Sequence, residues 1–252
     1  MRRIRILGMT PLLLSLLLLP AGCGDDGGTG PNGAGSITVP IAVGNTWIYS
    51  VTTSSKEAST ESDTTTIIGT ETRYGETWHL FVDRVDAETT FVRQEGQRLF
   101  VVPPFAEEGS GKDDDPIGAY FRRVLEASLP WQFADFAVPS GTSWTLVDAE
   151  TTFVVVQGTG SFEADVEISF RGASRGRTAV TVPAGSYTNA YEGEIRQLVV
   201  ISTPAGVDSM TGERVIWVMD GVGLVKSEET SQDSAGGAIE TTTEVLEGYT
   251  LH

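Results

Sequence analysis

The sequence predicts a mainly all-β protein, folded as a curved or partly closed antiparallel β-sheet, or half-barrel, with one short amphipathic helix. Two observations lead to this prediction. Segments rich in Thr, Val, Ile and aromatic residues recur along most of the chain, the clearest of them with apolar and polar residues in alternation. Gly, Pro, Asn and Asp separate these segments at short intervals, which is typical of a meander of hairpins closing toward a barrel.

The clearest strand runs from Phe162 to Phe170. Its apolar residues occupy every second position, and Glu163, Asp165 and Glu167 lie between them. A period of two places the apolar set on one face of a sheet and the acids on the other. This strand therefore has one buried face and one wet face, as in an antiparallel sheet.

Eleven further segments have strand composition, and together they fill most of the chain. They are Thr46–Thr53, Thr64–Glu71, Thr77–Val85, Thr89–Gln94, Arg98–Val102, Thr145–Val156, Arg177–Val182, Glu194–Ser202, Arg214–Met219, Leu224–Thr230 and Ile239–Leu246.

One segment departs from this pattern and predicts a helix from about Pro116 to Leu129. Its apolar residues recur three and four positions apart, as on one face of a helix. Asp115 is suited to the N-cap and Pro116 to the first helical position, and Pro130 stops the helix. A single amphipathic helix among strands must bury its apolar face, so we expect it against the concave side of the sheet.

The first 22 residues have the layout of a secretory signal peptide. Three arginines give a positively charged start, Leu12–Leu19 form a short apolar run, and small residues precede Cys23. The run is too short for a stable transmembrane helix. A short membrane anchor that stays in place is the alternative.

The end of this leader resembles the lipobox of bacterial lipoproteins, in which leucines and then Ala-Gly-Cys mark the cleavage site; Pro20 stands where that family usually has leucine. The resemblance implies that Cys23 is acylated and tethers the chain to a membrane of the bacterial cell envelope. Gly24 follows in place of an inner-membrane retention aspartate, which favours the outer membrane. Ordinary cleavage nearby, with Cys23 left as a free thiol or removed, is the alternative. Cys23 is the only cysteine, so it has no disulfide partner in the chain.

The leader divides the chain into three parts: a signal peptide (residues 1–22), a lipidated cysteine with a flexible glycine-rich linker (residues 23–36), and one β-rich domain (residues 37–252). The linker is rich in glycine and almost free of apolar residues. Removing the leader takes away three arginines and no acid, so the net charge falls from −17 to −20. Such a charge excludes nucleic acid as a partner, because its binding requires clustered Lys and Arg.

The chain offers little catalytic or metal chemistry. Gly172-Ala-Ser174-Arg-Gly176 matches the G-x-S-x-G pattern of serine hydrolases, but a strand is expected after it in place of a helix, so we interpret it as a hairpin loop. Asp113–Asp115 begins like a calcium-binding loop, whose later ligand positions are apolar here. Only two histidines are present, without zinc-ligand spacing, and His79 is expected to be half-buried in a strand. We predict no catalytic residue, no metal and no cofactor.

Three phrases carry a resemblance to a known family: PIAVGNTWIYSV (Pro40–Val51), VTVPAGSYTNAYEGEI (Val180–Ile195) and WVMDGVGLVKSEE (Trp217–Glu229). Their order and wording resemble a broad family of exported bacterial β-rich proteins that includes the TapB-like proteins. That family is similar in fold to the LolA/LolB lipoprotein carriers. The resemblance implies a curved antiparallel half-barrel with helices against its mouth, and it supplies no catalytic residues.

These observations give two principal hypotheses of function. In the first, the chain is a non-enzymatic envelope lipoprotein whose concave face binds a lipid-like ligand, an acyl chain or a protein segment through Trp47, Trp78, Phe121 and Trp217. In the second, it is a structural or protein-interaction domain whose core is filled and binds no ligand. A hydrolase is a third hypothesis with less support. A large apolar pocket favours the first hypothesis, and a solidly packed interior favours the second.

Overall fold

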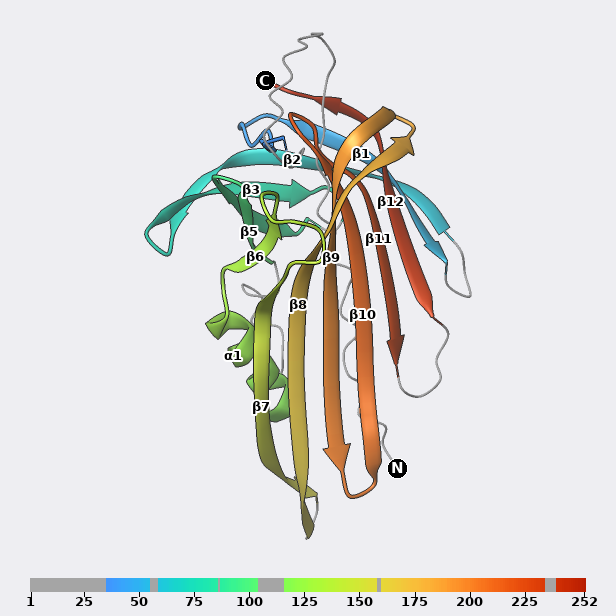
Figure 1. The fold of residues 1–252 in the computed structure, drawn as a ribbon. Coiled ribbons are helices and arrows are strands. Elements are labelled where there is room, and N and C mark those ends of the chain that lie inside the picture. Colours follow the sequence, from blue (N-terminus) through green and yellow to red (C-terminus); the bar gives the residue numbers. More distant parts are fainter. Residues whose placement is uncertain (1–34, 55–58, 86, 104–115, 158–159, 234–238) are drawn as a thin grey trace.

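The structure is a computed structural model that describes residues 35–54, 59–85, 87–103, 116–157, 160–233 and 239–252. These residues form one helix and a 12-stranded antiparallel sheet (Figure 1). The strands of the first half are β1 (Thr46–Ser54), β2 (Ser59–Arg73), β3 (Glu76–Asp83), β4 (Thr89–Glu95), β5 (Arg98–Val102) and β6 (Trp131–Asp135). Those of the second half are β7 (Ser143–Gln157), β8 (Gly160–Val182), β9 (Gly185–Thr203), β10 (Gly206–Met219), β11 (Gly223–Asp233) and β12 (Glu240–Thr250). The helix α1 (Pro116–Ala127) lies between β5 and β6 in the chain.

The sheet consists of two meanders that share one junction. Its strand order is β6-β5-β4-β3-β2-β1-β12-β11-β10-β9-β8-β7, so all paired strands are consecutive in sequence except β1 and β12. That pair aligns Trp47 with Tyr249 and Tyr49 with Leu246, with a bulge between Ile48 and Tyr49. The predicted fold class is confirmed: the sheet is antiparallel and curls until it is nearly closed into a barrel.

Side chains rather than a strand ladder bridge the two edge strands, β6 and β7. Trp144 of β7 lies against Gly172 of β8 and donates its indole N–H to the carbonyl of Gln132 on β6 at 2.6 Å. The connection between β6 and β7 bonds to β8 as well, because Gly141 N–H donates to Ser174 O at 2.7 Å and Ser174 N–H to Thr142 O at 2.8 Å. We call this contact between β6 and β7 the seam. It depends on Gly172, which leaves room for the indole ring of Trp144.

The segment before β1, residues 35–41, crosses one end of the barrel; we call it the entry segment. Ile37 and Val39 are buried. Their backbone N–H groups donate to the side-chain carbonyls of Gln97 and Gln94, each at 2.8 Å. On the other side, Gly221 N–H in the β10–β11 turn donates to Thr38 O at 2.9 Å. The chain therefore enters the domain at the end opposite the tips of the β7–β8 and β9–β10 hairpins (Figure 1).

The helix α1 covers part of the concave face, as predicted. Tyr120 meets Phe153 of β7 edge to face with ring centroids 5.0 Å apart, and Phe121 meets Phe170 of β8 in the same way at 6.5 Å. Leu125, also on the helix, is buried. The helix ends at Ala127 and not at Leu129, two residues earlier than predicted. The predicted N-cap, Asp115, lies outside the described residues.

The prediction of a hairpin loop at residues 172–176 is wrong. The two predicted strands Phe162–Phe170 and Arg177–Val182 belong to one strand, β8, of 23 residues. The register against β9 shifts between Ser174 and Gly176, and Gly176 has φ +104°, so the glycines form a bulge and do not reverse the chain. The backbone of Ser174 bonds to the β6–β7 connection, which holds this bulge in place.

Other strand predictions differ from the structure mainly at their ends. Strand β9 begins at Gly185 and β10 at Gly206, each about eight residues earlier than predicted, because both leave a tight turn directly. Strand β6 was not predicted. The leader, Cys23, most of the linker and the acidic run Asp113–Asp115 lie outside the described residues.

The seam gives a stability prediction. A Cβ built on Gly172 would lie 2.3 Å from the indole of Trp144, so Gly172→Ala must displace the ring and its hydrogen bond. We expect the free energy of unfolding, measured by urea denaturation, to fall by about 1–3 kcal/mol, as for other overpacked cores.

Gly212→Ala is the matched control. Gly212 lies inside β10, and its added Cβ would come no closer than 3.5 Å to the side chain of Gln197. This variant should keep or slightly gain stability, because alanine loses less backbone freedom on folding than glycine. Equal stability of the two variants would contradict the role assigned to Trp144.

Candidate functional site

Trp47, the first residue predicted to contact a ligand, belongs to the filled interior of the barrel. It is completely buried and stacks on Phe81 with ring centroids 5.9 Å apart. Its indole N–H donates to Val222 O at 3.2 Å, and the hydroxyl of Tyr49 donates to Leu224 O at 2.9 Å. Both polar groups are therefore satisfied within the core, as in packed interiors.

Trp78 lies on the opposite face of the sheet from Trp47. It is three residues from Phe81 in β3, and it forms a separate small cluster with Phe91 and Val102. Its indole N–H donates to Arg73 O at 3.0 Å, and the guanidinium of Arg73 lies 3.6 Å from the centroid of Phe91. Trp78 is thus the centre of a satellite core on the outer side of β3–β5.

The other two candidates occupy two further environments. Phe121 is half-buried between α1 and β8. Trp217 is half-buried on β10, with the ammonium group of Lys226 4.7 Å from its ring centroid. The structure therefore does not bring Trp47, Trp78, Phe121 and Trp217 into one site, and ligand binding by these residues stays a prediction.

Ser174, the serine of the G-x-S-x-G pattern, is buried inside β8. A nucleophile elbow requires a sharp turn between a strand and a helix, which exposes the serine hydroxyl. Here the strand continues on both sides of the serine. Tyr191, buried on the neighbouring strand, has a pKa raised to about 12 by its burial, so it stays protonated. The pattern does not form a nucleophile elbow in this fold.

A buried ionic cluster on the inner face of the sheet was not predicted from the sequence. Arg214 of β10 and Glu244 of β12 are both buried, and their side chains approach to 3.2 Å. Ser227 of β11, between them, donates its hydroxyl to Glu244 at 2.7 Å. Glu229 of β11 lies 3.9 Å from Arg214. The sequence did contain a signal for this burial, namely the alternation of faces along a strand. Glu244 is two residues from the buried Leu246, so both side chains lie on the same face of β12.

The carboxyl groups of this cluster are shifted toward their neutral forms. Burial raises the pKa of Glu244 above its ordinary value of 4.5, although Arg214 and Ser227 oppose the shift. Burial also raises the pKa of Glu229, again against Arg214. The cost of desolvating the carboxylate therefore exceeds the stabilisation that the arginine provides. This cluster is the part of the described interior best able to take up a proton.

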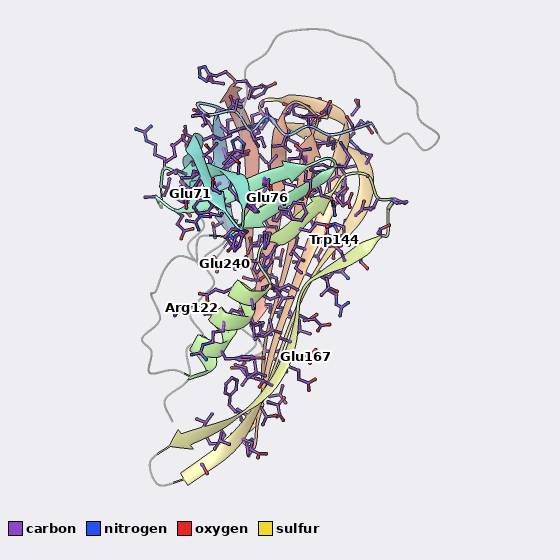
Figure 2. The ribbon with its side chains drawn as sticks, turned by 90° about the vertical axis from the view of Figure 1, so that its left-hand side faces the viewer. Glu71, Glu76, Arg122, Trp144, Glu167 and Glu240 are labelled. Carbon is purple, nitrogen blue, oxygen red and sulfur yellow. The ribbon has the colours of Figure 1, made fainter. Side chains whose placement is uncertain are left out.

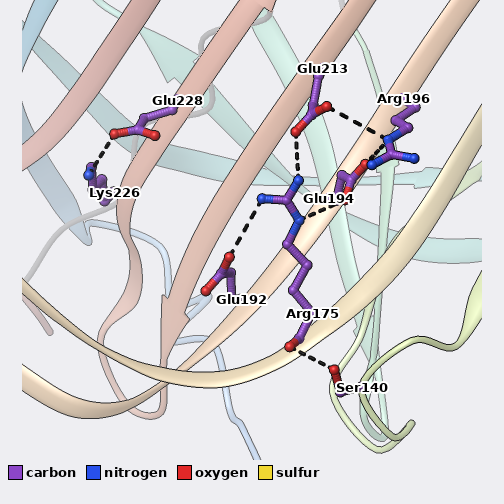
Figure 3. Close-up of polar contacts among 8 residues, drawn as sticks. All are labelled: Ser140, Arg175, Glu192, Glu194, Arg196, Glu213, Lys226 and Glu228. Carbon is purple, nitrogen blue, oxygen red and sulfur yellow. Dashed lines mark hydrogen bonds and ion pairs between the residues drawn. The ribbon is translucent and has the colours of Figure 1, made fainter.

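A second ionic network lies on the outer face, around Arg175 (Figure 3). Arg175 contacts Glu194 and Glu213, each at 2.6 Å, and Glu192 at 3.7 Å. Arg196 pairs with Glu194 from the other side. Burial alone would lower the pKa of Arg175, but Glu194 and Glu213 raise it above its usual value. Because the carboxylate of Glu194 is nearly buried, this network joins β8, β9 and β10 more firmly than exposed ion pairs would.

An open groove of about 600 Å³ lies beside this network, over β8–β11. Its wall includes Arg171, Arg196 and Glu213, which alternate along their strands with buried residues and so face outward. Hydroxyl and amide side chains supply most of the rest. This groove lies on the outer face, whereas the first hypothesis requires an apolar pocket on the concave face.

Within the described residues, no group of three or more His, Cys, Asp and Glu side chains could hold a metal ion. His79 is half-buried in β3 as expected, and burial lowers its pKa. In the same part of the chain, no helix is long and apolar enough to cross a membrane.

Comparisons with known proteins give a likeness of fold alone. No protein-family model matches the chain, and no curated protein matches it. One similar solved structure comes from Bacteroides fragilis and is provisionally described as an exported protein with a YmcC-like fold; the identity is 12% and the TM-score 0.40, over 84% of this chain and 97% of that one. A second, from Parabacteroides distasonis, is provisionally described as a lipoprotein, with 12% identity, a TM-score of 0.35 and the same coverage.

Neither likeness is close enough to assign a family, a ligand or a partner to this chain. Neither protein is described as TapB-like or as a LolA/LolB carrier. That resemblance therefore stays a prediction from the sequence.

The buried cluster gives a prediction for the pH dependence of stability. A carboxyl whose pKa is higher in the folded state binds its proton more tightly there, so its contribution to stability is present at low pH and is lost as the pH rises through the folded pKa. We expect the stability of the wild type relative to Glu244→Gln to decrease as the pH rises above about 4.5. Urea denaturation across this pH range measures the difference.

Glu228→Gln is the control, because Glu228 lies on the outer face of β11 and its ion pair within the described part of the chain is with Lys226. Its stability difference from the wild type should depend little on pH. Parallel pH profiles of Glu244→Gln and Glu228→Gln would contradict the assignment of a raised pKa to Glu244.

Proposed function

We propose that this chain is a lipid-anchored, non-catalytic interaction domain of the bacterial cell envelope, held at the outer membrane through Cys23. The sequence supports the anchor: a short leader ends in Ala-Gly-Cys, and a glycine-rich linker follows. The partner in this proposal is another envelope protein. The domain would present surfaces to it and would not transform a substrate.

The observation that carries the proposal is that the point where the chain enters the domain and the tips of two long hairpins lie at opposite ends. The entry segment reaches the barrel at one end, and the hairpins β7–β8 and β9–β10 extend from the other (Figure 1). A domain tethered through Gly35 and the linker before it would direct these hairpins away from the membrane. The exposed tip of β9–β10, from Pro204 to Asp208, would then be free to meet a partner.

The composition of the interior also favours interaction over transport of a lipid. Aromatic side chains fill the barrel around Trp47 and Phe81, and the polar groups of Trp47 and Tyr49 are hydrogen-bonded. The remaining inner face on β10–β12 carries Arg214, Ser227 and Glu244. An acyl chain placed there would have to cover charged groups, which is costly.

An apolar ligand beneath α1 is the second candidate, favoured by one observation. The helix meets the concave face through aromatic contacts, Tyr120 with Phe153 and Phe121 with Phe170. A helix that lifted from the sheet would expose these rings together. Phe121 would then contact the ligand, as the sequence predicted.

Metabolic labelling tests the anchor. Labelled fatty acid should be incorporated into the wild-type chain and not into Cys23→Ser, which should leave the membrane fraction because the serine hydroxyl cannot replace the acylated thiol. Pro20→Leu is the control: it restores the usual lipobox residue and should keep the label. Label retained in Cys23→Ser would refute lipidation at this residue.

Mass spectrometry of non-covalently bound lipids separates the two candidates. When the purified full chain is extracted with solvent, we expect the amount of any released lipid to stay well below one molecule per chain. A stoichiometric lipid in the wild type that is lost in Phe121→Asp would overturn the proposal and support a ligand beneath α1. Phe100→Asp, which changes the satellite core around Trp78, controls for non-specific effects of a buried charge.

A further inference from the structure

Strand β7 forms one edge of the sheet. It is 15 residues long and, among the described residues, pairs with β8 alone. An edge strand of this length presents a row of backbone N–H and C=O groups to any other extended chain. Native proteins protect such edges with charges, bulges, proline or a covering element.

The protection of β7 covers only its first half. A bulge between Thr145 and Val147 distorts that half, Trp144 closes it against β6, and Asp148 and Glu150 carry charge. The second half, residues 151–156, reads TTFVVV and contains no charge, glycine or proline. This composition is typical of segments that pair edge to edge.

The helix does not cover this half of the edge. It contacts the inner face of β7 through Tyr120 and Phe153. In the view from the side of β7, α1 lies beside the strand and the hairpin tip extends past it (Figure 2). On the outer face, Val154 is 65% exposed.

We propose that residues 151–156 of β7 pair with the same residues of a second copy of this chain, antiparallel about a two-fold axis. The two sheets would then continue into one. This inference goes beyond the proposed envelope interaction and does not depend on it.

Strand geometry restricts where the axis can lie. Residues directly opposite in an antiparallel pair point to the same face, and faces alternate along each strand, so a symmetric pair must be centred on a residue. Centred on Val154, the pairing sets Val154 opposite Val154, Phe153 opposite Val155, and Thr152 opposite Val156. The most exposed apolar side chain of the edge then lies at the axis.

Residues 151–156 are uncharged and mostly apolar, so the same segment of a second copy matches them and is the occupant that this edge fits. The chain carries a net charge of −17, so two copies can approach only where acids are kept apart. In this register the two Glu150 residues lie about 27 Å from each other, well beyond the Debye length at physiological salt. Glu163, beside Val154 on β8, is separated from its counterpart by three strand spacings, or about 14 Å.

Single cysteines test the register in the full-length, membrane-anchored chain. Cys23 is the only native cysteine, so the unmodified chain is the control for disulfides formed through it. Under mild oxidation Val154→Cys should give a disulfide-linked dimer, because opposite Cβ atoms lie at disulfide distance. Thr152→Cys, on the same face but about 14 Å from its counterpart, should give at least about tenfold less.

Val207→Cys measures the yield from random collision, because Val207 is 66% exposed on the β10 tip and lies away from the edge. Equal yields at positions 152, 154 and 207 would overturn the proposal. So would a cross-link from Val154→Cys to a different protein only.

Sedimentation of the purified full chain in detergent provides the second test. The wild type should sediment as a dimer at micromolar concentration. Val154→Lys places two positive charges at the axis and should be monomeric, whereas Val207→Lys adds the same charge elsewhere and should remain dimeric. Circular dichroism confirms that both variants are folded. A monomeric wild type, or equal loss of the dimer in both variants, would overturn the proposal.

Discussion

The ladder between β1 and β12 joins the first and last strands of the domain, and the rest of the sheet depends on it. Without this pairing the two meanders would be separate sheets with two more open edges. The junction also places Trp47 and Tyr49 where they reach the carbonyl groups of Val222 and Leu224 on the other half. Because the partners are about 175 residues apart, this contact orders nearly the whole chain at once.

The inner face of the sheet is divided into regions of different chemistry. Aromatic and aliphatic side chains fill the part enclosed by the first meander, and α1 covers β7 and β8. The strands β10–β12 instead bury an arginine and a glutamate that satisfy each other only in part, since Glu244 Oε1 has no hydrogen-bond partner among the described residues. Covering these groups with a purely apolar ligand would be costly, which is in keeping with the interaction domain proposed above.

Local pattern predicted much of this fold, and long-range packing supplied the remainder. The alternation of Phe162–Phe170 and the helical spacing after Pro116 were sufficient to place the first half of β8 and the helix α1. The glycines at 172 and 176 were misleading, because their purpose is set by Trp144 and by the β6–β7 connection, which lie far from them in sequence. The four aromatic candidates are distributed over different environments for the same reason: composition identifies aromatic residues, but the face and the neighbouring strand decide what each one touches.

The entry segment has a mechanical consequence for a tethered protein. Any pull on the linker reaches residues 35–41 before it reaches β1. These residues are held by Gln94 and Gln97 on one meander and by Asp220 and Gly221 at a turn of the other. Tension is therefore shared between both halves of the sheet and acts on several hydrogen bonds together, so the first strand is shielded from being peeled away one residue at a time. In the anchored chain proposed above, the same contacts would fix the direction in which the domain leans from its anchor.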